Sequence, residues 1–294
     1  MNAPERIRLT EFSHGGGCGC KIAPAILSQI LAASSTVLGP IRGLPRDLLV
    51  GTETSDDAAV YRLNDAQALV ATTDFFTPIV DDPYDFGRIA ATNALSDIYA
   101  MGGKPIMALA IVGMPLEKIP VTVIRKILEG GESVGAQAGI PIAGGHSIDT
   151  LEPIYGLVGL GLVHPGKVKK NSTARAGDVL VLGKPLGVGI LSAALKKGKL
   201  TAAGYREMLA STTQLNTPGM ALADMADVHA LTDVTGFGLA GHLLEMLRGS
   251  KLAGEVRVDD LPVFAEALDW VKKGVATGAS ERNWNGYGAE VQLP

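Results

Sequence analysis

The feature that most constrains the fold is the succession of short apolar segments, which falls into two series separated by a polar, basic stretch at residues 164–178. Before this stretch, segments with the composition of strands alternate with apolar runs at helical spacing, and the same mixture returns after it. Chains that mix strands and helices in this way form α/β or α+β domains. We therefore expect two such domains, at residues 24–163 and 179–294, with residues 164–178 as the linker.

The apolar spacing also places the elements within each series. The helix expected at 84–100 carries apolar residues three and four apart and stops at Gly102-Gly103. In the first series we also expect helices at 24–35 and 121–138, and strands at 48–50, 58–61, 68–71, 106–112, 140–143 and 154–163. In the second series we expect strands at 179–182, 229–232 and 255–258, helices at 188–195 and 239–248, and helical structure up to about residue 225.

Composition and charge exclude several classes of protein. Of the 294 residues, 47% are hydrophobic and 37 are glycine, which is enough apolar material for a sizeable core and many tight turns. The net charge is −4 and the basic residues form no long run, so we expect no nucleic-acid partner. We find no secretion signal in the first residues and no apolar stretch that would span a membrane. The expectation is a cytoplasmic protein with no membrane partner.

The run from His14 to Lys21 places both cysteines of the chain, Cys18 and Cys20, beside a lysine on a glycine-rich backbone. A neighbouring cation can lower the pKa of a thiol, and the thiolate is the reactive form, so this run is a candidate reactive loop in a mobile arm at residues 1–23. Cysteines so close together make neither a useful disulfide nor a zinc site, which indicates a reducing compartment. The run is not a P-loop, because Cys20 and Ile22 stand where that motif needs a glycine and a hydroxyl residue. A disordered arm without chemistry is the alternative.

Three aspartate motifs recur where the chain leaves an expected strand or enters one. They are Ser55-Asp56-Asp57, Thr72-Thr73-Asp74 and Leu231-Thr232-Asp233, and each pairs a carboxylate with a hydroxyl neighbour. A single aspartate at a strand end is ordinarily a turn residue. The recurrence favours a cluster of hard oxygen ligands, which suits Mg²⁺ shared with substrate phosphates.

Two further groups of polar residues have an ordinary structural interpretation and a functional one. Asn93 and Asp97 are four residues apart and therefore share one face of an expected apolar helix, where they either cap a neighbour or hold a ligand. The segment Ala143–Ser147 follows a short expected strand, and its successive amide groups could bind an anion. A plain turn is the alternative for that segment.

The segment Gly236–Gly241 matches the G-x-G-x-x-G pattern of dinucleotide-binding loops literally. It follows an expected strand, opens an expected helix, and has Asp259 about 20 residues further on, as that fingerprint requires. Against it, the polar residues Asp233-Val234-Thr235 separate the strand from the glycines. The fingerprint is also expected near the start of its domain.

Taken together, several of these segments resemble those of the selenophosphate synthetase (selenide, water dikinase) family, in the same order and over essentially the whole chain. The Cys-Gly-Cys-Lys run distinguishes that family from the related aminoimidazole ribonucleotide synthetases. The segments that carry the resemblance are 14–21, 55–61, 72–76, 87–103, 143–148 and 231–238.

The resemblance implies the two-domain fold of aminoimidazole ribonucleotide synthetase, with an N-terminal mixed sheet that dimerises and a C-terminal α/β domain. It implies a reaction in which ATP, selenide and water give selenophosphate, phosphate and AMP. The expected partners are therefore ATP, selenide, water and a second copy of the chain. Mg²⁺ is the expected cofactor, and K⁺ is a candidate for a further one.

The resemblance also implies roles for individual residues. Cys18 stands at the essential cysteine or selenocysteine of the family, and Lys21 at the catalytic lysine that contacts ATP. The magnesium ligands correspond to Asp57, Asp97 and Asp233. The nucleotide contacts, some of them across the dimer, correspond to Lys21, Thr54, Ser55, Asp56, Asp74, Asp97, Gly145, His146 and Ser147.

One departure from the family affects the second domain. Family members continue into a segment with an Asp-Pro-Gln-Thr-Ser-Gly-Gly-like motif, whereas this sequence ends at Val291-Gln292-Leu293-Pro294. The second domain is therefore expected to be incomplete. Two other functions remain as alternatives: a dinucleotide-dependent oxidoreductase that uses Gly236–Gly241, and a catalytically silent member of the family.

Overall fold

The computed structural model describes residues 7–13, 15–16, 21–22, 26, 30, 46–52 and 55–293. Cys18, Cys20 and Thr54 lie outside the described residues, and so does the helix expected at 24–35 apart from Ile26 and Ile30. Within the expected arm, Leu9–Phe12 form the short 3-10 helix η1, in which Leu9 is fully buried. The backbone amide and hydroxyl of Thr10 donate to the Asp81 carboxylate, which fixes this part of the chain to the first half.

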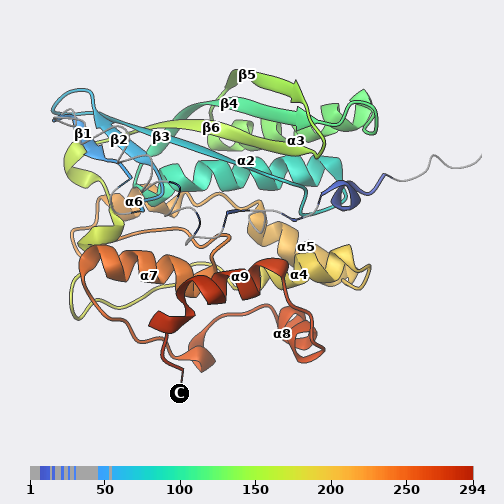
Figure 1. Ribbon diagram of the computed structural model, residues 1–294. Helices are drawn as coiled ribbons and strands as arrows, with labels where there is room; N and C mark the ends of the chain where they lie inside the picture. Colours follow the sequence, from blue (N-terminus) through green and yellow to red (C-terminus); the bar gives the residue numbers. More distant parts are fainter. Residues whose placement is uncertain are drawn as a thin grey trace, which may run out of the picture.

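Six strands of the first half form one mixed sheet in the order β1-β2-β3-β6-β4-β5 (Figure 1). β4 and β5 are parallel, and the other neighbouring strands are antiparallel. The strands are β1 (Leu48–Val50), β2 (Ala59–Arg62), β3 (Ala68–Phe76), β4 (Lys104–Met114), β5 (Ile142–Asp149) and β6 (Ile154–Val163).

Helices α2 (Pro83–Ala100) and α3 (Val121–Ala138) cover one face of this sheet (Figure 1). α2 begins where it does because the Asp82 side chain accepts a hydrogen bond from the amide of Asp85 and Pro83 occupies the first turn. The helix packs closely on β6, since Gly161 there has no Cβ; an added Cβ would lie 2.4 Å from the Ile98 side chain. Because α2 lies this close to the sheet, its side chains reach those of β3, as in the hydrogen bond from Thr72 of β3 to Asp97 of α2.

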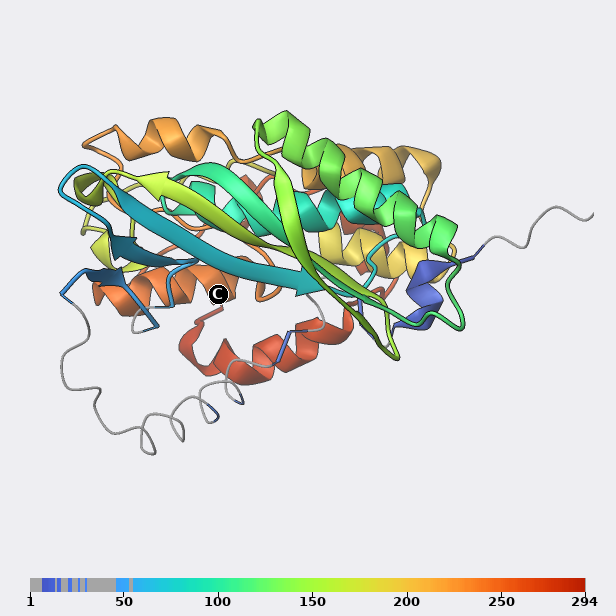
Figure 2. The ribbon, with the colours of Figure 1, turned by 90° about the horizontal axis from the view of Figure 1, so that it is seen from above.

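No helix among the described residues lies on the opposite face of the sheet, which Figure 2 shows from above. Residues alternate along β3 between the two faces, with Val70, Thr72 and Asp74 buried toward the helices and Phe75 45% exposed on the open face. Residues directly opposite one another on paired strands share a face. By the strand register, the open face carries Leu69, Ala71, Phe75, Leu109, Val158, Leu160 and Leu162.

The sequence located five of the six strands of the first half and misplaced β5. The strand expected at 140–143 instead covers Ile142–Asp149, so Ala143–Ser147 is not a turn that follows a strand but the body of the edge strand. The reason is the close approach of two backbones. A Cβ at Gly145 would lie 2.0 Å from the Ala110 carbonyl oxygen of β4, so glycine permits pairing there rather than a turn.

The second half is mainly helical over residues 164–293. Its helices are α4 (Val188–Lys196), α5 (Ala202–Thr212), α6 (Pro218–Ala223), α7 (Gly238–Ser250), α8 (Ala265–Lys272) and α9 (Gly278–Tyr287), and its 3-10 turns are η3 (Pro165–Lys167), η4 (Asn171–Thr173), η5 (Val258–Asp260) and η6 (Gly288–Glu290). The helices expected at 188–195 and 239–248 and the helical structure up to about residue 225 are confirmed.

The strands expected at 179–182, 229–232 and 255–258 are wrong as hydrogen-bonded strands. Over residues 164–293 the structure assigns no strand and only one isolated bridge, between Leu186 and Val263. The three segments instead line an open cavity of about 1920 Å³. Apolar content alone does not make a strand, because a strand requires a partner backbone; Val179 and Val181 are 85% and 89% exposed.

The two halves contact each other through α2 and through the segment expected as a linker. Asn216 donates to the hydroxyl of Ser96 on α2 at 2.7 Å, and the Tyr205 hydroxyl donates to Asp85 at 2.7 Å. No helix among the described residues is both long and apolar enough to cross a bilayer.

Candidate functional site

Three aspartates from three segments meet where the two halves face each other. Asp97 comes from α2, Asp57 precedes β2, and Asp233 precedes α7. One carboxylate oxygen of each lies within 4.8 Å of those of the other two. The structure thus brings together the three residues expected as metal ligands, from both halves of the chain.

The surroundings of these three aspartates, the triad, disfavour the ionised form of Asp57 and Asp97. Burial raises the pKa of Asp57 well above its usual range, and the carboxylates of Asp233 and Asp97 raise it further. Burial does the same to the pKa of Asp97, with Asp233 and then Asp74 adding to the effect. Like charges held this close cannot all be ionised cheaply unless a cation lies among them.

Threonine hydroxyls orient two of the three carboxylates and leave other oxygens available. The Thr232 hydroxyl donates to Asp57 Oδ1 at 2.9 Å, and the Thr72 hydroxyl donates to Asp97 Oδ2. The other oxygen of Asp57, Oδ2, is buried and has no hydrogen-bond partner among the described residues. A buried acceptor is normally paired. The triad therefore fits a hard divalent cation such as Mg²⁺, which takes carboxylate oxygens.

A fourth carboxylate, Asp74, links the triad to Lys21. The Lys21 ammonium lies 3.8 Å from Asp74 Oδ2, to which the Asn93 side-chain amide also donates. Burial raises the pKa of Asp74, whereas the positive charge of Lys21 lowers it. Asn93 contacts Asp74 and Asp97 belongs to the triad, so both residues of this face of α2 lie at the aspartate site, and their part in holding a ligand stays a prediction. Of the aspartates in the three motifs, the structure brings Asp57 and Asp233 together with Asp97, and Asp74 contributes to the raised pKa of Asp97.

The loop before Asp57 is held by a residue from outside the first half. Ser55 adopts a φ of 53°, in the left-handed region that a residue with a side chain rarely occupies. Asn171 of η4 holds this turn in two places. Its backbone amide donates to Asp56 Oδ1 at 2.6 Å, and its side-chain amide donates to the Ser55 carbonyl at 2.8 Å. Sequence reasoning did not single out Asn171, since it lies in the segment expected as a linker and no motif marks it.

We expect Asn171→Ala to raise the KM for ATP, the substrate that the resemblance implies, several-fold and to lower the free energy of unfolding by about 1 kcal/mol, because the Ser55 carbonyl loses its side-chain donor while the backbone amide of residue 171 still donates to Asp56. Asn171 is 1% exposed, so water cannot readily replace its side chain. Steady-state kinetics and urea unfolding measure the two effects. Ser172→Ala, one residue along η4, is the matched control. An unchanged KM in Asn171→Ala would show that the turn does not depend on this residue.

The remaining residues expected to contact nucleotide lie elsewhere in the chain. Gly145, His146 and Ser147 are exposed on β5, and β6 and β4 separate β5 from β3, which carries Asp74. Within one copy of the chain they do not join the triad. Their part in nucleotide binding, from the same copy or from a second one, stays a prediction, as do the roles of Cys18 and Thr54.

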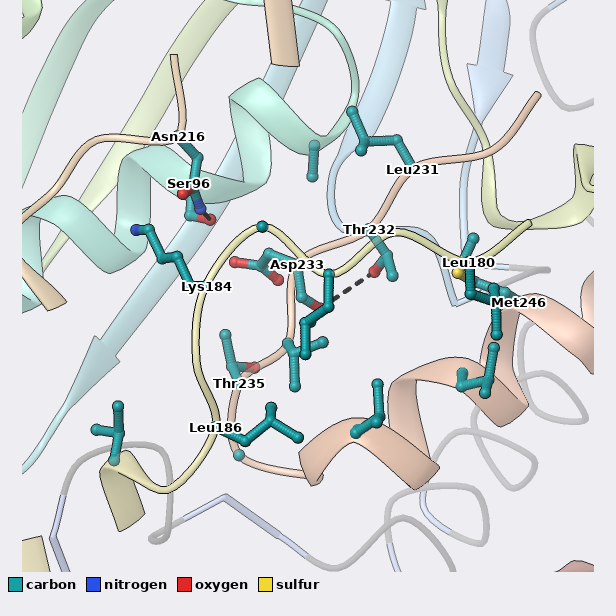
Figure 3. Close-up of a pocket in the computed structure, with 18 of the residues that line it drawn as sticks. Ser96, Leu180, Lys184, Leu186, Asn216, Leu231, Thr232, Asp233, Thr235 and Met246 are labelled. Carbon is teal, nitrogen blue, oxygen red and sulfur yellow. Dashed lines mark hydrogen bonds between the residues drawn. The ribbon is translucent and has the colours of Figure 1, made fainter. Parts of the chain in front are cut away.

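The cavity, which is lined by the second half and by residues of the first half including Ser96 of α2, reaches Asp233. Figure 3 shows the Asp233 and Lys184 side chains on its wall, with Ser96 and Asn216 beyond Lys184. Burial lowers the pKa of the Lys184 amine, while the negative charge of Asp233 raises it. The Lys184 ammonium donates to the Gln214 carbonyl at 2.6 Å. Lys184 is a cation near the site that sequence reasoning missed, because a lone lysine after an apolar run carries no motif.

The context that a dinucleotide fingerprint needs is missing around Gly236–Gly241. α7 does begin at Gly238, but the segment that precedes the glycines is not a strand of a sheet. A Rossmann loop requires the strand, because the strand points the first turn at the pyrophosphate. This geometry does not favour the oxidoreductase alternative.

Comparison with known proteins identifies the family. The profile described as "AIR synthase related protein, N-terminal domain" matches residues 55–163, and that described as "AIR synthase related protein, C-terminal domain" matches residues 175–279. A curated protein of Burkholderia ambifaria (strain MC40-6), named "Selenide, water dikinase", is 66% identical over 294 residues, covering 100% of this chain and 81% of that protein. The chain belongs to the selenide, water dikinase family. Relatives of the same name from Pseudomonas straminea and Rhizobium meliloti (strain 1021) are 65% and 58% identical; the matches cover 97% and 98% of this chain and 79% and 81% of theirs.

Solved structures confirm the fold of this selenide, water dikinase family member as that of aminoimidazole ribonucleotide synthetase. Thiamine-monophosphate kinase from Stenotrophomonas maltophilia K279a matches with a TM-score of 0.62 at 22% identity, over 90% of this chain and 84% of that one. A structure titled "AaThiL complexed with AMPPCP and TMP" matches with a TM-score of 0.67 at 17% identity, over 90% and 83% of the two chains. At these identities the likeness concerns the fold alone.

Proposed function

We propose that this protein makes selenophosphate from ATP, selenide and water, with release of AMP and phosphate. The observation that carries the proposal is the convergence of Asp57, Asp97 and Asp233 from both halves of the chain, with Lys21 nearby at Asp74. The names of the relatives, at up to 67% identity, support the same reaction. Phosphoryl transfer needs positioning and charge neutralisation more than covalent chemistry, and this site offers both.

Each charged residue has a distinct part in the proposed reaction. Asp57, Asp97 and Asp233 would hold Mg²⁺, which when bound neutralises phosphate charge and orients the triphosphate. Lys21 acts as a point charge on the γ-phosphate or on the leaving oxygens. Asp74 positions the Lys21 ammonium, and Asn93 orients Asp74 by donating to its carboxylate. The nucleotide itself is contacted by Lys21, Thr54, Ser55, Asp56, Asp74, Asp97, Gly145, His146 and Ser147, with K⁺ as a candidate further ion.

Cys18 is proposed to deliver selenide to the γ-phosphorus or to protect it there, since a soft thiol sits three residues from Lys21 in the sequence. We expect Cys18→Ser to lower the rate of selenophosphate formation by about 100-fold or more, with binding of a non-hydrolysable ATP analogue retained. ³¹P NMR of the product with free selenide measures the rate. Cys20→Ser removes a thiol from the same run and is the control. Selenophosphate formation by Cys18→Ser at the wild-type rate would remove this role.

A homodimer is proposed through the open face of the sheet. By the strand register that face presents apolar side chains, and no helix among the described residues covers it (Figure 2); surfaces of this kind mark interaction sites. A second copy is the occupant that the symmetry of most oligomers favours.

The cytoplasm is the proposed compartment, because it keeps Cys18 and Cys20 reduced.

We expect Val158→Glu to convert the dimer to a monomer, because it buries a charge at the centre of the proposed interface. Light scattering coupled to size-exclusion chromatography gives the mass of each species. Val258→Glu, at a position 69% exposed in the second half, is the control and should leave the mass unchanged. A wild-type protein of monomeric mass, or a Val158→Glu dimer, would contradict the proposed interface.

AMP release tests the proposed function as a whole. We expect AMP to form from ATP with Mg²⁺ and selenide, in step with a selenophosphate signal. A catalytically silent protein would form neither product. An oxidoreductase would instead enhance NADH fluorescence on binding and form no AMP.

A further inference from the structure

The glycine motif Gly236–Gly241 is left without a role by the proposed chemistry, yet it lies beside the site. The ring of Phe237, its second residue, has its centroid 5.9 Å from the Lys21 ammonium. That distance is within the range in which a cation is attracted to the face of an aromatic ring. Asp233 lies four residues earlier on the same segment. One short stretch of chain thus supplies both a triad carboxylate and an aromatic contact to Lys21.

The backbone around Phe237 is fixed by helix α9. The Tyr287 hydroxyl donates to the Phe237 carbonyl at 2.7 Å, and the Asn283 side-chain amide donates to the Gly236 carbonyl at 2.8 Å. Gly241 is required by the close packing of this turn, since an added Cβ would lie 2.6 Å from the Phe237 Cβ. Gly241 therefore allows the Phe237 side chain to pack closely against α7.

The orientation of the Phe237 ring is set by a buried histidine. His242 is 6% exposed, and its ring centroid lies 5.5 Å from that of Phe237 with 31° between the planes. Both ring nitrogens of His242 are engaged. Nδ1 lies 3.0 Å from Glu245 Oε2, and Nε2 lies 3.2 Å from the Thr235 hydroxyl. A histidine held at both nitrogens cannot turn, so it presents a fixed surface to Phe237.

We propose that Phe237 is a positioning residue, whose ring, seated by Gly241, His242 and Tyr287, holds the Lys21 ammonium at the aspartate site. A lysine side chain has four rotatable bonds, and the Lys21 ammonium lies 3.8 Å from the Asp74 carboxylate. The contact with the face of the Phe237 ring reduces the number of positions that the Lys21 ammonium can occupy. The inference rests on the proposed role of Lys21 in contacting the triphosphate.

The test is a double-mutant cycle on the affinity for a non-hydrolysable ATP analogue with Mg²⁺, measured by titration calorimetry. We expect Phe237→Leu to weaken binding about three- to tenfold, and Phe237→Tyr, which keeps the ring face, to stay within about twofold of the wild type. Lys21→Met alone should weaken binding, and adding Phe237→Leu to it should have no further effect. Trp284→Leu, which removes a 44% exposed aromatic ring from α9, is the control and should bind as the wild type does.

A second measurement separates the electrostatic contribution of the Phe237 ring to affinity from the contribution of its shape. Replacing Phe237 by 3,4,5-trifluorophenylalanine keeps the size and fold but withdraws charge from the ring face, so affinity should fall toward that of Phe237→Leu. A purely structural ring would show no such fall. Wild-type affinity in the fluorinated protein, or an equal loss from Phe237→Leu with and without Lys21, would overturn the inference while leaving Lys21's role intact. Wild-type affinity in Lys21→Met would instead remove that role, and the inference with it.

Discussion

Asp97→Asn is expected to lower the rate of Mg²⁺-dependent AMP release by about 100- to 1,000-fold, and Asp57→Asn to do the same. Asparagine keeps the volume of the side chain but removes one of the charges that would hold the cation. Both carboxylates lie within 4.8 Å of Asp233, so losing either leaves the site with too few anionic ligands. Initial rates of AMP formation at several Mg²⁺ concentrations measure the effect.

The same substitution should stabilise the protein when no divalent cation is present. The raised pKa of Asp97 means that the folded protein binds a proton there more readily than the unfolded chain does, so the free energy of unfolding falls as pH rises through that pKa. At neutral pH without Mg²⁺, Asp97→Asn removes this cost, and Tm should rise by a few degrees. Asp65→Asn, at an exposed loop position, should change neither rate nor Tm. An unchanged rate in both Asp57→Asn and Asp97→Asn would remove the metal assignment.

Lys21→Met is expected to lower kcat for AMP release by about 100-fold or more, because the site then lacks the cation that the Asp74 carboxylate positions. Lys21→Arg should recover only part of this rate, since a planar guanidinium does not reproduce a compact point charge. Steady-state kinetics in ATP separate the effect on kcat from that on KM.

The control for this lysine is Lys126→Met, at an exposed position on α3 that pairs with Glu129. It removes the same charge from the protein without touching the site, and its kcat should equal that of the wild type. If Lys21→Met also retained wild-type kcat, the lysine would have no part in the chemistry.

The N-terminal sheet could be predicted from the sequence because it depends on local signals, whereas the set Asp57, Asp97 and Asp233 was implied by the family resemblance. Alternating apolar residues locate β3, and helical spacing with a stop at Gly102-Gly103 locates α2. The recurrence of carboxylates beside hydroxyl residues pointed to a shared site, and the Thr232 and Thr72 hydroxyls do bind Asp57 and Asp97.

What the sequence did not predict depends on contacts between distant segments. The apolar run at 179–182 has the composition of a strand, but pairing depends on a partner backbone that no local pattern specifies. Asn171 organises the Ser55–Asp57 turn from 115 residues away, and its own neighbours give no sign of this. Phe237 was noticed only as part of a glycine pattern, because its contact with Lys21 exists only in the folded chain.

The most direct test of the account is a crystal structure with Mn²⁺ in place of Mg²⁺ and a non-hydrolysable ATP analogue, read by the anomalous signal of manganese. We expect a manganese peak at about 2.1 Å from carboxylate oxygens of Asp57, Asp97 and Asp233, with the triphosphate of the analogue bound to the same ion. A manganese ion bound at other residues, or a triphosphate bound away from these aspartates, would contradict the account.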